Sequence, residues 1–161
     1  MGAVGSAWAN SWYRDWEAKK ERDQELKGLT LLVFTELGHN DGLFQMFEQH
    51  PDSQDLFPPT KLQTDVWVAS RVRLAQLLPN EHTATLTRYY GKIQDVLDIY
   101  NNPTLHNDMK TKFLSEDVKK AQKYGKAAMM HGSKYMFVDY PEFTDEKHAK
   151  FVEKARKLKD Q

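Results

Sequence analysis

The sequence predicts an all-α fold, an irregular bundle of five to six helices that begins with a long helix. Apolar residues recur at intervals of three, four or seven along most of the chain, which is the spacing of helices with one buried face. No segment alternates apolar and polar residues convincingly, as a half-buried strand would. With 161 residues, of which 40% are hydrophobic, the chain is long enough to bury a core. We assign residues 12–161 to a single helical domain, and residues 1–11, mostly small and polar, to a flexible lead-in or a cloning remnant.

The first helix is expected to run from about Trp8 to Phe47. Its apolar stripe comprises Leu26, Leu29, Val33, Leu37, Phe44 and Phe47. A turn signal at residues 38–42, Gly-His-Asn-Asp-Gly, interrupts this stripe. Because the apolar residues on both sides keep the same phase, we expect the helix to continue through the signal, with or without a bend. A break at this point is the competing interpretation.

Prolines and capping residues divide the rest of the chain into further helices. Thr64 is a good N-cap for a second helix that stops at Pro79, and Asn80 can cap a third that ends before Pro103. Ser115 is a suitable cap for a fifth helix. The expected ranges of the last three helices are 105–113, 116–137 and a basic helix from about residue 144.

One face of the predicted fifth helix carries only small side chains. Ala121, Gly125, Ala128 and Gly132 recur at intervals of four, three and four. Another backbone can approach such a face closely. We expect the face to pack against a helix of the same chain, and a dimer seam is the alternative.

The charge balance and composition exclude several classes of function. The chain has 23 basic and 23 acidic side chains, and a dedicated nucleic-acid binder would normally show a basic excess. The last third, residues 106–161, is nevertheless basic, which is typical of a solvated helix face and leaves an acidic partner as the alternative. The absence of cysteine excludes disulfides and thiolate chemistry and fits a cytoplasmic location.

The sequence contains no recognisable catalytic or cofactor motif. Its six histidines lack the spacing of a zinc or di-iron site, and nucleophile elbows, phosphate loops and dinucleotide fingerprints are missing. A short likeness to a globin corner at residues 47–57 is not continued, because Pro79 and Pro103 interrupt the helices that a haem pocket would need. We therefore expect no metal, no cofactor and no catalytic residue, and we lean against an enzyme without excluding one.

Three polar residues are placed where they would meet between helices. Asn40 lies on the apolar stripe of the first helix, and Glu36 lies one turn before it. Arg71 falls between apolar positions of the second helix. Because buried polar groups need partners, we expect Glu36, Asn40 and Arg71 to form an interhelical network that fixes the register of the bundle. A ligand site is the alternative.

Three tryptophans at four-residue spacing, Trp8, Trp12 and Trp16, form one aromatic stripe at the start of the chain. Indoles on one face need an apolar surface, which a core, a protein partner or a membrane headgroup layer can provide. We treat these three residues as the candidate interaction site.

Several short segments, taken in order, resemble a pattern in uncharacterised bacterial proteins that have one N-terminal membrane helix and a small helical domain. The segments are 16–22 (WEAKKER), 35–40 (TELGHN), 62–67 (LQTDVW), 77–81 (LLPNE) and 86–93 (LTRYYGKI). The resemblance implies an architecture only and carries no activity. It also implies a membrane span before the charged segment, and this sequence has no apolar run of the required ~20 residues.

These observations together predict a non-catalytic helical interaction or scaffold domain, cytoplasmic and with a membrane tether as an open option. An unidentified protein is the expected partner, a membrane surface is a further option, and nucleic acid is not expected. The alternative is a small-molecule-binding or enzymatic bundle with an aromatic-lined pocket. Its lining would be Asn40, Trp67, Arg71, His82, Tyr89 and Tyr90.

Overall fold

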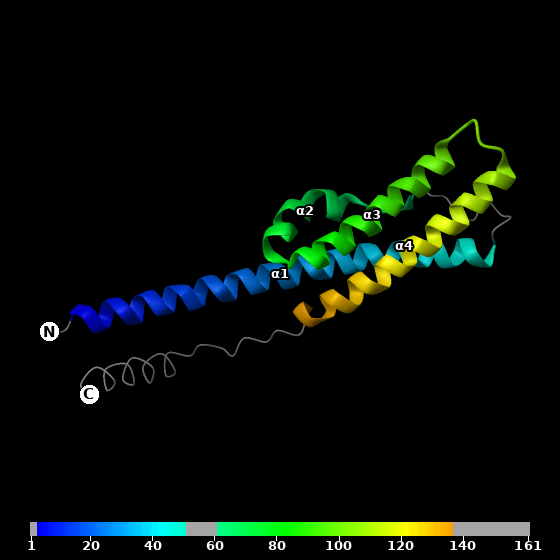
Figure 1. Ribbon diagram of the computed structural model, residues 1–161. Coiled ribbons are helices and arrows are strands. Elements are labelled where there is room, and N and C mark those ends of the chain that lie inside the picture. Colours follow the sequence, from blue (N-terminus) through cyan, green and yellow to red (C-terminus); the bar gives the residue numbers. More distant parts are fainter. Residues whose placement is uncertain (1–2, 51–60, 137–161) are drawn as a thin grey trace. The chain divides into compact units, whose positions relative to one another are not determined.

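The computed structural model describes residues 3–50 and 61–136 (Figure 1), and most of these residues lie in helices. There are four helices in the described residues: α1 (Ala3–Gln49), α2 (Asp65–Leu77), α3 (Asn80–Asn101) and α4 (Asn107–Met136). No strand occurs in these ranges. The predicted all-α class is confirmed.

The number of helices differs from the prediction of five to six. The predicted fourth and fifth helices are one helix, α4, and Ser115 lies inside it instead of capping its start. The buried residues Leu114 and Val118 lie on the same face on both sides of the expected boundary, so nothing interrupts the helix there. The predicted last helix, from about residue 144, lies outside the described residues.

Helix α1 runs through the turn signal at residues 38–42, as expected. No residue described has a positive φ, so Gly38 and Gly42 keep helical geometry. Phe44 and Asn40 are both fully buried, and tertiary contacts on this face outweigh the low helix propensity of glycine. At its other end α1 begins at Ala3, inside the segment that we assigned to a flexible lead-in.

The chain divides into two compact units, and the larger one is Leu26–Phe137. It contains the second half of α1 together with α2, α3 and α4 (Figure 1). Contacts between Asn40 and Gln63 and between Glu36 and Trp67 make α2 antiparallel to α1. The helices α3 and α4 form an antiparallel hairpin, since Lys92 pairs with Asp117 and His82 lies near Tyr135. This unit is therefore an up-down-up-down helix bundle.

The small-residue face of α4 packs inside this bundle. A Cβ atom added to Gly125 would lie 3.1 Å from Tyr89 Cε2, and one added to Gly132 would lie 2.5 Å from Phe34 Cζ. Ala121 and Ala128 on the same face are also buried. The face thus lets α1 and α3 approach α4 closely, which matches the intramolecular packing that we expected.

Two helix starts differ from the predicted capping. Thr64 occupies the N-cap position of α2 but makes no side-chain hydrogen bond there. Pro79 takes the N-cap position of α3, and Asn80 is already the first helical residue. The first turn of α2 therefore needs its hydrogen-bond acceptors from elsewhere in the bundle.

Candidate functional site

Glu36 of α1 supplies the acceptors that the first turn of α2 lacks. Its side chain is 2% exposed. Oε2 accepts a hydrogen bond from the backbone N–H of Val66 at 2.9 Å, and Oε1 accepts one from Trp67 at 3.3 Å. These are the second and third residues of α2, where a negative group is favoured by the unpaired N–H groups and the helix dipole. Glu36 thus acts as an N-cap that comes from a different helix.

A third hydrogen bond ties the same carboxylate to α3. The hydroxyl of Tyr90 donates to Glu36 Oε1 at 2.5 Å. Three helices therefore meet at one buried carboxylate, and each of its hydrogen bonds comes from a different residue. A buried charge with this number of donors is compensated, and removal of a donor would be costly.

Asn40, one turn further along α1, holds the segment that leads into α2. Its side-chain amide donates to the carbonyl of Gln63 at 2.8 Å and accepts from the N–H of Gln63 at 2.8 Å. The His39 ring and the carbonyl of Lys61 are also within hydrogen-bond distance, at 3.1 Å. This pairing satisfies both polar groups of one backbone residue, so it fixes the position of the chain before α2 begins.

Arg71 does not join Glu36 and Asn40. Its side chain is exposed on α2, while Trp67, Ser70 and Leu74 form the buried face. The two buried members of the predicted network are satisfied by backbone groups and by Tyr90, which leaves Arg71 no buried anion to pair with. An arginine at this position remains in water, where its charge is solvated at low cost.

Aromatic side chains fill the space beside Glu36. The rings of Trp67 and Tyr90 stack with centroids 4.9 Å apart, and Tyr89 meets Tyr90 edge-on at 4.9 Å. Burial raises the pKa of Tyr89 and of Tyr90 well above the usual range, and the hydrogen bond to Glu36 raises the pKa of Tyr90 further. The packing of these rings against one another favours a core over the aromatic-lined pocket considered from the sequence.

A second polar cluster lies where α3 begins and α4 ends. His82 is 4% exposed, and its Nδ1 lies 2.9 Å from the hydroxyl of Tyr135. Its Nε2 lies 3.2 Å from the carboxylate of Glu81. A neutral imidazole that donates from Nε2 and accepts at Nδ1 satisfies both contacts. Desolvation lowers the pKa of His82, and Lys134 and His131 lower it further.

A small cavity adjoins this cluster. It has a volume of about 20 Å³ and is bordered by His82 and Tyr135 and by apolar residues of all four helices. Thr30 also borders it, and the hydroxyl of Thr30 is buried without a hydrogen-bond partner among the described residues. A space of ~10–15 Å³ is enough for one water molecule. The cavity is therefore large enough for a buried water and too small for a metabolite.

The aromatic stripe of α1 is described for two of its three tryptophans. Trp12 and Trp16 are partly exposed, and the ring of Tyr13 lies 6.1 Å from that of Trp16. The Nζ atom of Lys20 lies 5.3 Å from the centre of the Trp16 ring, which is a cation–π distance. The side chain of Trp8 lies outside the described part. This segment thus presents indoles and a cation together.

The sequence did not indicate several partners of these clusters. Tyr90 and Gln63 are separated from Glu36 and Asn40 by 54 and 23 residues, and one of the two interactions uses only backbone groups of Gln63. No residue type marks a backbone acceptor in advance. The contact of His82 with Tyr135 also spans 53 residues.

Within the described ranges, no group of three or more metal-ligating side chains converges. None of the described helices combines the length and apolarity that crossing a bilayer requires. Comparisons with protein-family models, with curated proteins and with solved structures find no significant match to this chain. The class that the fold defines is therefore an all-α helix bundle with a buried interhelical polar network.

Proposed function

We propose that the protein is a non-catalytic helical interaction domain that works at the cytoplasmic side of a membrane. The observation that supports this proposal is that the buried polar side chains are hydrogen-bonded within the bundle. Glu36 accepts hydrogen bonds from the backbone of α2 and from the hydroxyl of Tyr90. Asn40 is hydrogen-bonded to the backbone of the segment that leads into α2. They hold helices together, so a binding function has to be performed by surface residues.

The aromatic segment of α1 is the proposed contact surface. Trp12 and Trp16 lie on one face and are partly exposed, and Lys20 adds a positive charge beside Trp16. Indoles with neighbouring cations are favoured at protein hot spots and at the headgroup layer of membranes. The resemblance to membrane-anchored helical domains, which the order of the sequence segments suggested, is consistent with the second of these surfaces.

Liposome flotation and an affinity pull-down test the proposal. The variants Trp12→Ala and Trp16→Ala are compared with the unchanged protein and with Leu31→Ala, which removes a half-exposed apolar side chain elsewhere on α1. We expect the two tryptophan variants to lose a bound protein or lipid that Leu31→Ala retains. If both tryptophan variants keep every contact of the unchanged protein, the aromatic segment is not the contact surface and the proposal falls.

A further inference from the structure

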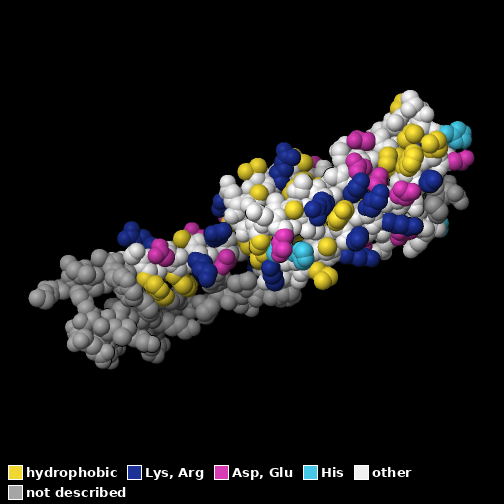
Figure 2. Space-filling view, in the orientation of Figure 1, with side chains coloured by type: hydrophobic (Ala, Val, Ile, Leu, Met, Phe, Trp, Pro, Cys, Tyr) yellow, Lys and Arg dark blue, Asp and Glu magenta, His cyan; other side chains and the backbone are white. Residues whose placement is uncertain are grey.

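The outward face of α4 carries a row of lysines. Helical spacing places Lys119, Lys123, Lys126 and Lys134 on the side of α4 opposite the buried small-residue face, with Lys120 beside them. All five side chains are exposed. We call these five residues the lysine ridge. Figure 2 shows Lys and Arg side chains gathered over the middle of α4.

The lysine ridge is a local excess of charge in a chain that is neutral overall. No acidic residue occurs between positions 118 and 136, whereas the whole chain has equal numbers of acidic and basic side chains. Within the described residues, only Lys120 of the five has an ion pair, with Asp117 at 3.6 Å. Asp117 is shared with Lys92, which lies closer at 3.1 Å. Within the part of the chain that the structure describes, ion pairs therefore leave most of the positive charge of the ridge uncompensated.

We propose that the lysine ridge binds a membrane surface that carries anionic lipid headgroups. A cluster of four to eight basic residues on an amphipathic helix is typical of recognition of anionic lipids. Such residues act as point charges near a surface and need no defined geometry. This inference deepens the proposed function, on which it rests, because it names the lipid chemistry that the domain would meet.

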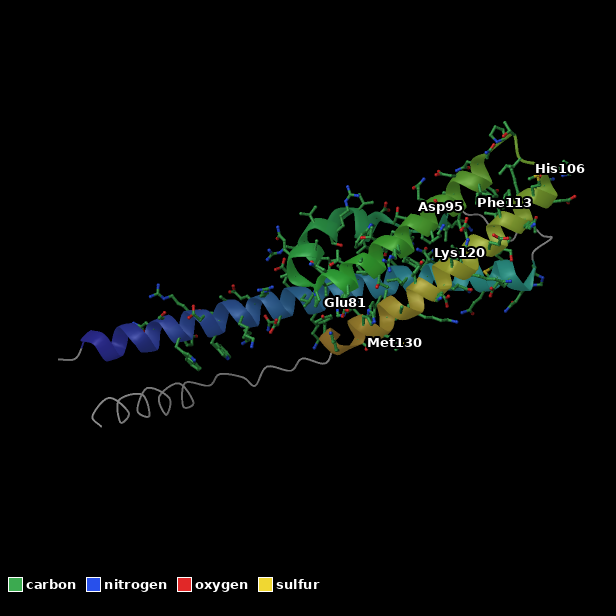
Figure 3. All side chains as sticks on the ribbon, in the orientation of Figure 1. Glu81, Asp95, His106, Phe113, Lys120 and Met130 are labelled. Carbon is green, nitrogen blue, oxygen red and sulfur yellow. The ribbon has the colours of Figure 1, made fainter. Side chains whose placement is uncertain are left out.

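The composition of the ridge favours lipid over other anionic partners. α4 contains no arginine, whose planar guanidinium is the group best suited to bidentate recognition of phosphates, bases and carboxylates. Met130 lies on the same face by helical spacing and is 76% exposed. Figure 3 shows it toward the C-terminal end of α4. An apolar side chain among lysines can enter the boundary between headgroups and acyl chains, whereas it gains little from a nucleic acid.

The lysines also occupy a geometry that suits a flat surface. Four of them follow one another at intervals of four, three and eight residues along a single helix. Their side chains therefore project from the same side of that helix. The buried face of α4 is engaged by α1 and α3, and the helix does not need to leave the bundle to present its lysines. Binding through the ridge therefore requires no rearrangement of the core.

Vesicle flotation with a triple variant tests this inference. The variant Lys119→Gln/Lys123→Gln/Lys126→Gln removes three exposed charges and keeps residues of similar helix propensity. The matched control Lys61→Gln/Arg71→Gln/Arg88→Gln removes the same charge from exposed positions outside α4. The vesicles consist of phosphatidylcholine alone or of equal parts phosphatidylcholine and phosphatidylserine. Circular dichroism verifies that both variants are folded.

The unchanged protein and the control are expected to bind the phosphatidylserine vesicles and not those of phosphatidylcholine alone. The triple α4 variant is expected to bind about 100-fold more weakly, since each lysine near an anionic surface contributes roughly fivefold. Added salt should release the unchanged protein, because the Debye length shrinks to about 3 Å at 1 M. Equal affinity for both vesicle types, or an equal loss in the control, would overturn the inference.

A single-stranded oligonucleotide provides the competing polyanion. The lipid inference is wrong if two results are obtained together. The unchanged protein would bind the oligonucleotide more tightly than the phosphatidylserine vesicles, and the triple α4 variant would lose binding to the oligonucleotide but keep binding to the vesicles. The ridge would then be a nucleic-acid site. The tryptophan variants in the same flotation separate this inference from the proposed function. If Trp12→Ala and Trp16→Ala lose vesicle binding while the triple α4 variant binds fully, the inference about the lysine ridge is wrong. The proposed interaction function of the aromatic segment is then still supported.

Discussion

The hydroxyl of Tyr90 donates a 2.5 Å hydrogen bond to the carboxylate of Glu36, which also accepts from the start of α2. This pair joins α1 to α3 at the point where α2 docks. The carboxylate therefore accepts the hydrogen bonds that an N-cap side chain would accept, because the side chain of Thr64 accepts none.

Replacement of Glu36 by Gln should lower the free energy of unfolding by about 2–4 kcal/mol, because an amide NH₂ would face N–H or O–H donors and leave one of them unsatisfied. Urea denaturation measures the change. Tyr90→Phe removes a single donor and should cost less, about 1–2 kcal/mol. A Glu36→Gln variant as stable as the original protein would show that the carboxylate is not needed as a cap.

Asn40→Leu should reduce stability by about 2–3 kcal/mol and broaden the unfolding transition. Leucine leaves the N–H and the carbonyl of Gln63 without their partners in a partly buried position. A broadened transition would indicate that α2 detaches before the rest of the bundle unfolds. Chemical denaturation followed by tryptophan fluorescence and by circular dichroism checks this, and coincident, unshifted transitions would contradict the role of Asn40 in fixing register.

The stability of the bundle should fall as the pH drops below about 6.5 because of His82. Its pKa is lowered from 6.5 in the folded protein, so the unfolded chain takes up the proton first. The contribution is fully present above pH 6.5 and is lost as the pH falls toward the lowered folded value. His131, Lys134 and Glu81 lie near the ring, and the Coulomb interactions with Lys134 and His131 oppose its protonation.

Urea midpoints measured between pH 5 and pH 8 test the role of His82. The variant His82→Gln should show a shallower decline than the unchanged protein. His106→Gln, at a side chain that is 79% exposed, is the control and should decline like the unchanged protein. An identical slope for His82→Gln and the unchanged protein would assign the pH dependence to other groups.

Two glycine substitutions should have opposite effects. Gly38→Ala is expected to stabilise the protein by about 0.5–1 kcal/mol, since Gly38 is in a helix and nothing lies within 4 Å of the added Cβ. Gly132→Ala should destabilise it by about 1–3 kcal/mol, because its Cβ would lie 2.5 Å from Phe34. Thermal melts compare the two. Stabilisation by both changes would mean that the contact between α4 and α1 is not tight.

The all-α class, the passage of α1 through residues 38–42 and the burial of Glu36 and Asn40 could all be predicted from the amino-acid sequence. Each of these follows from the phase of apolar residues along one helix, which is a local property of the chain. The same reasoning placed Arg71 among apolar positions, where the structure exposes it, and divided α4 at Ser115, where the helix continues.

The pairing of particular polar groups could not be predicted in this way, because it depends on how the helices pack. That Glu36 caps α2, that Asn40 pairs with the backbone of Gln63, and that His82 meets Tyr135 depend on contacts between residues 23 to 54 positions apart. Periodicity tells which side of a helix is buried, but the rotation and register of one helix against another follow from the packing of all of them.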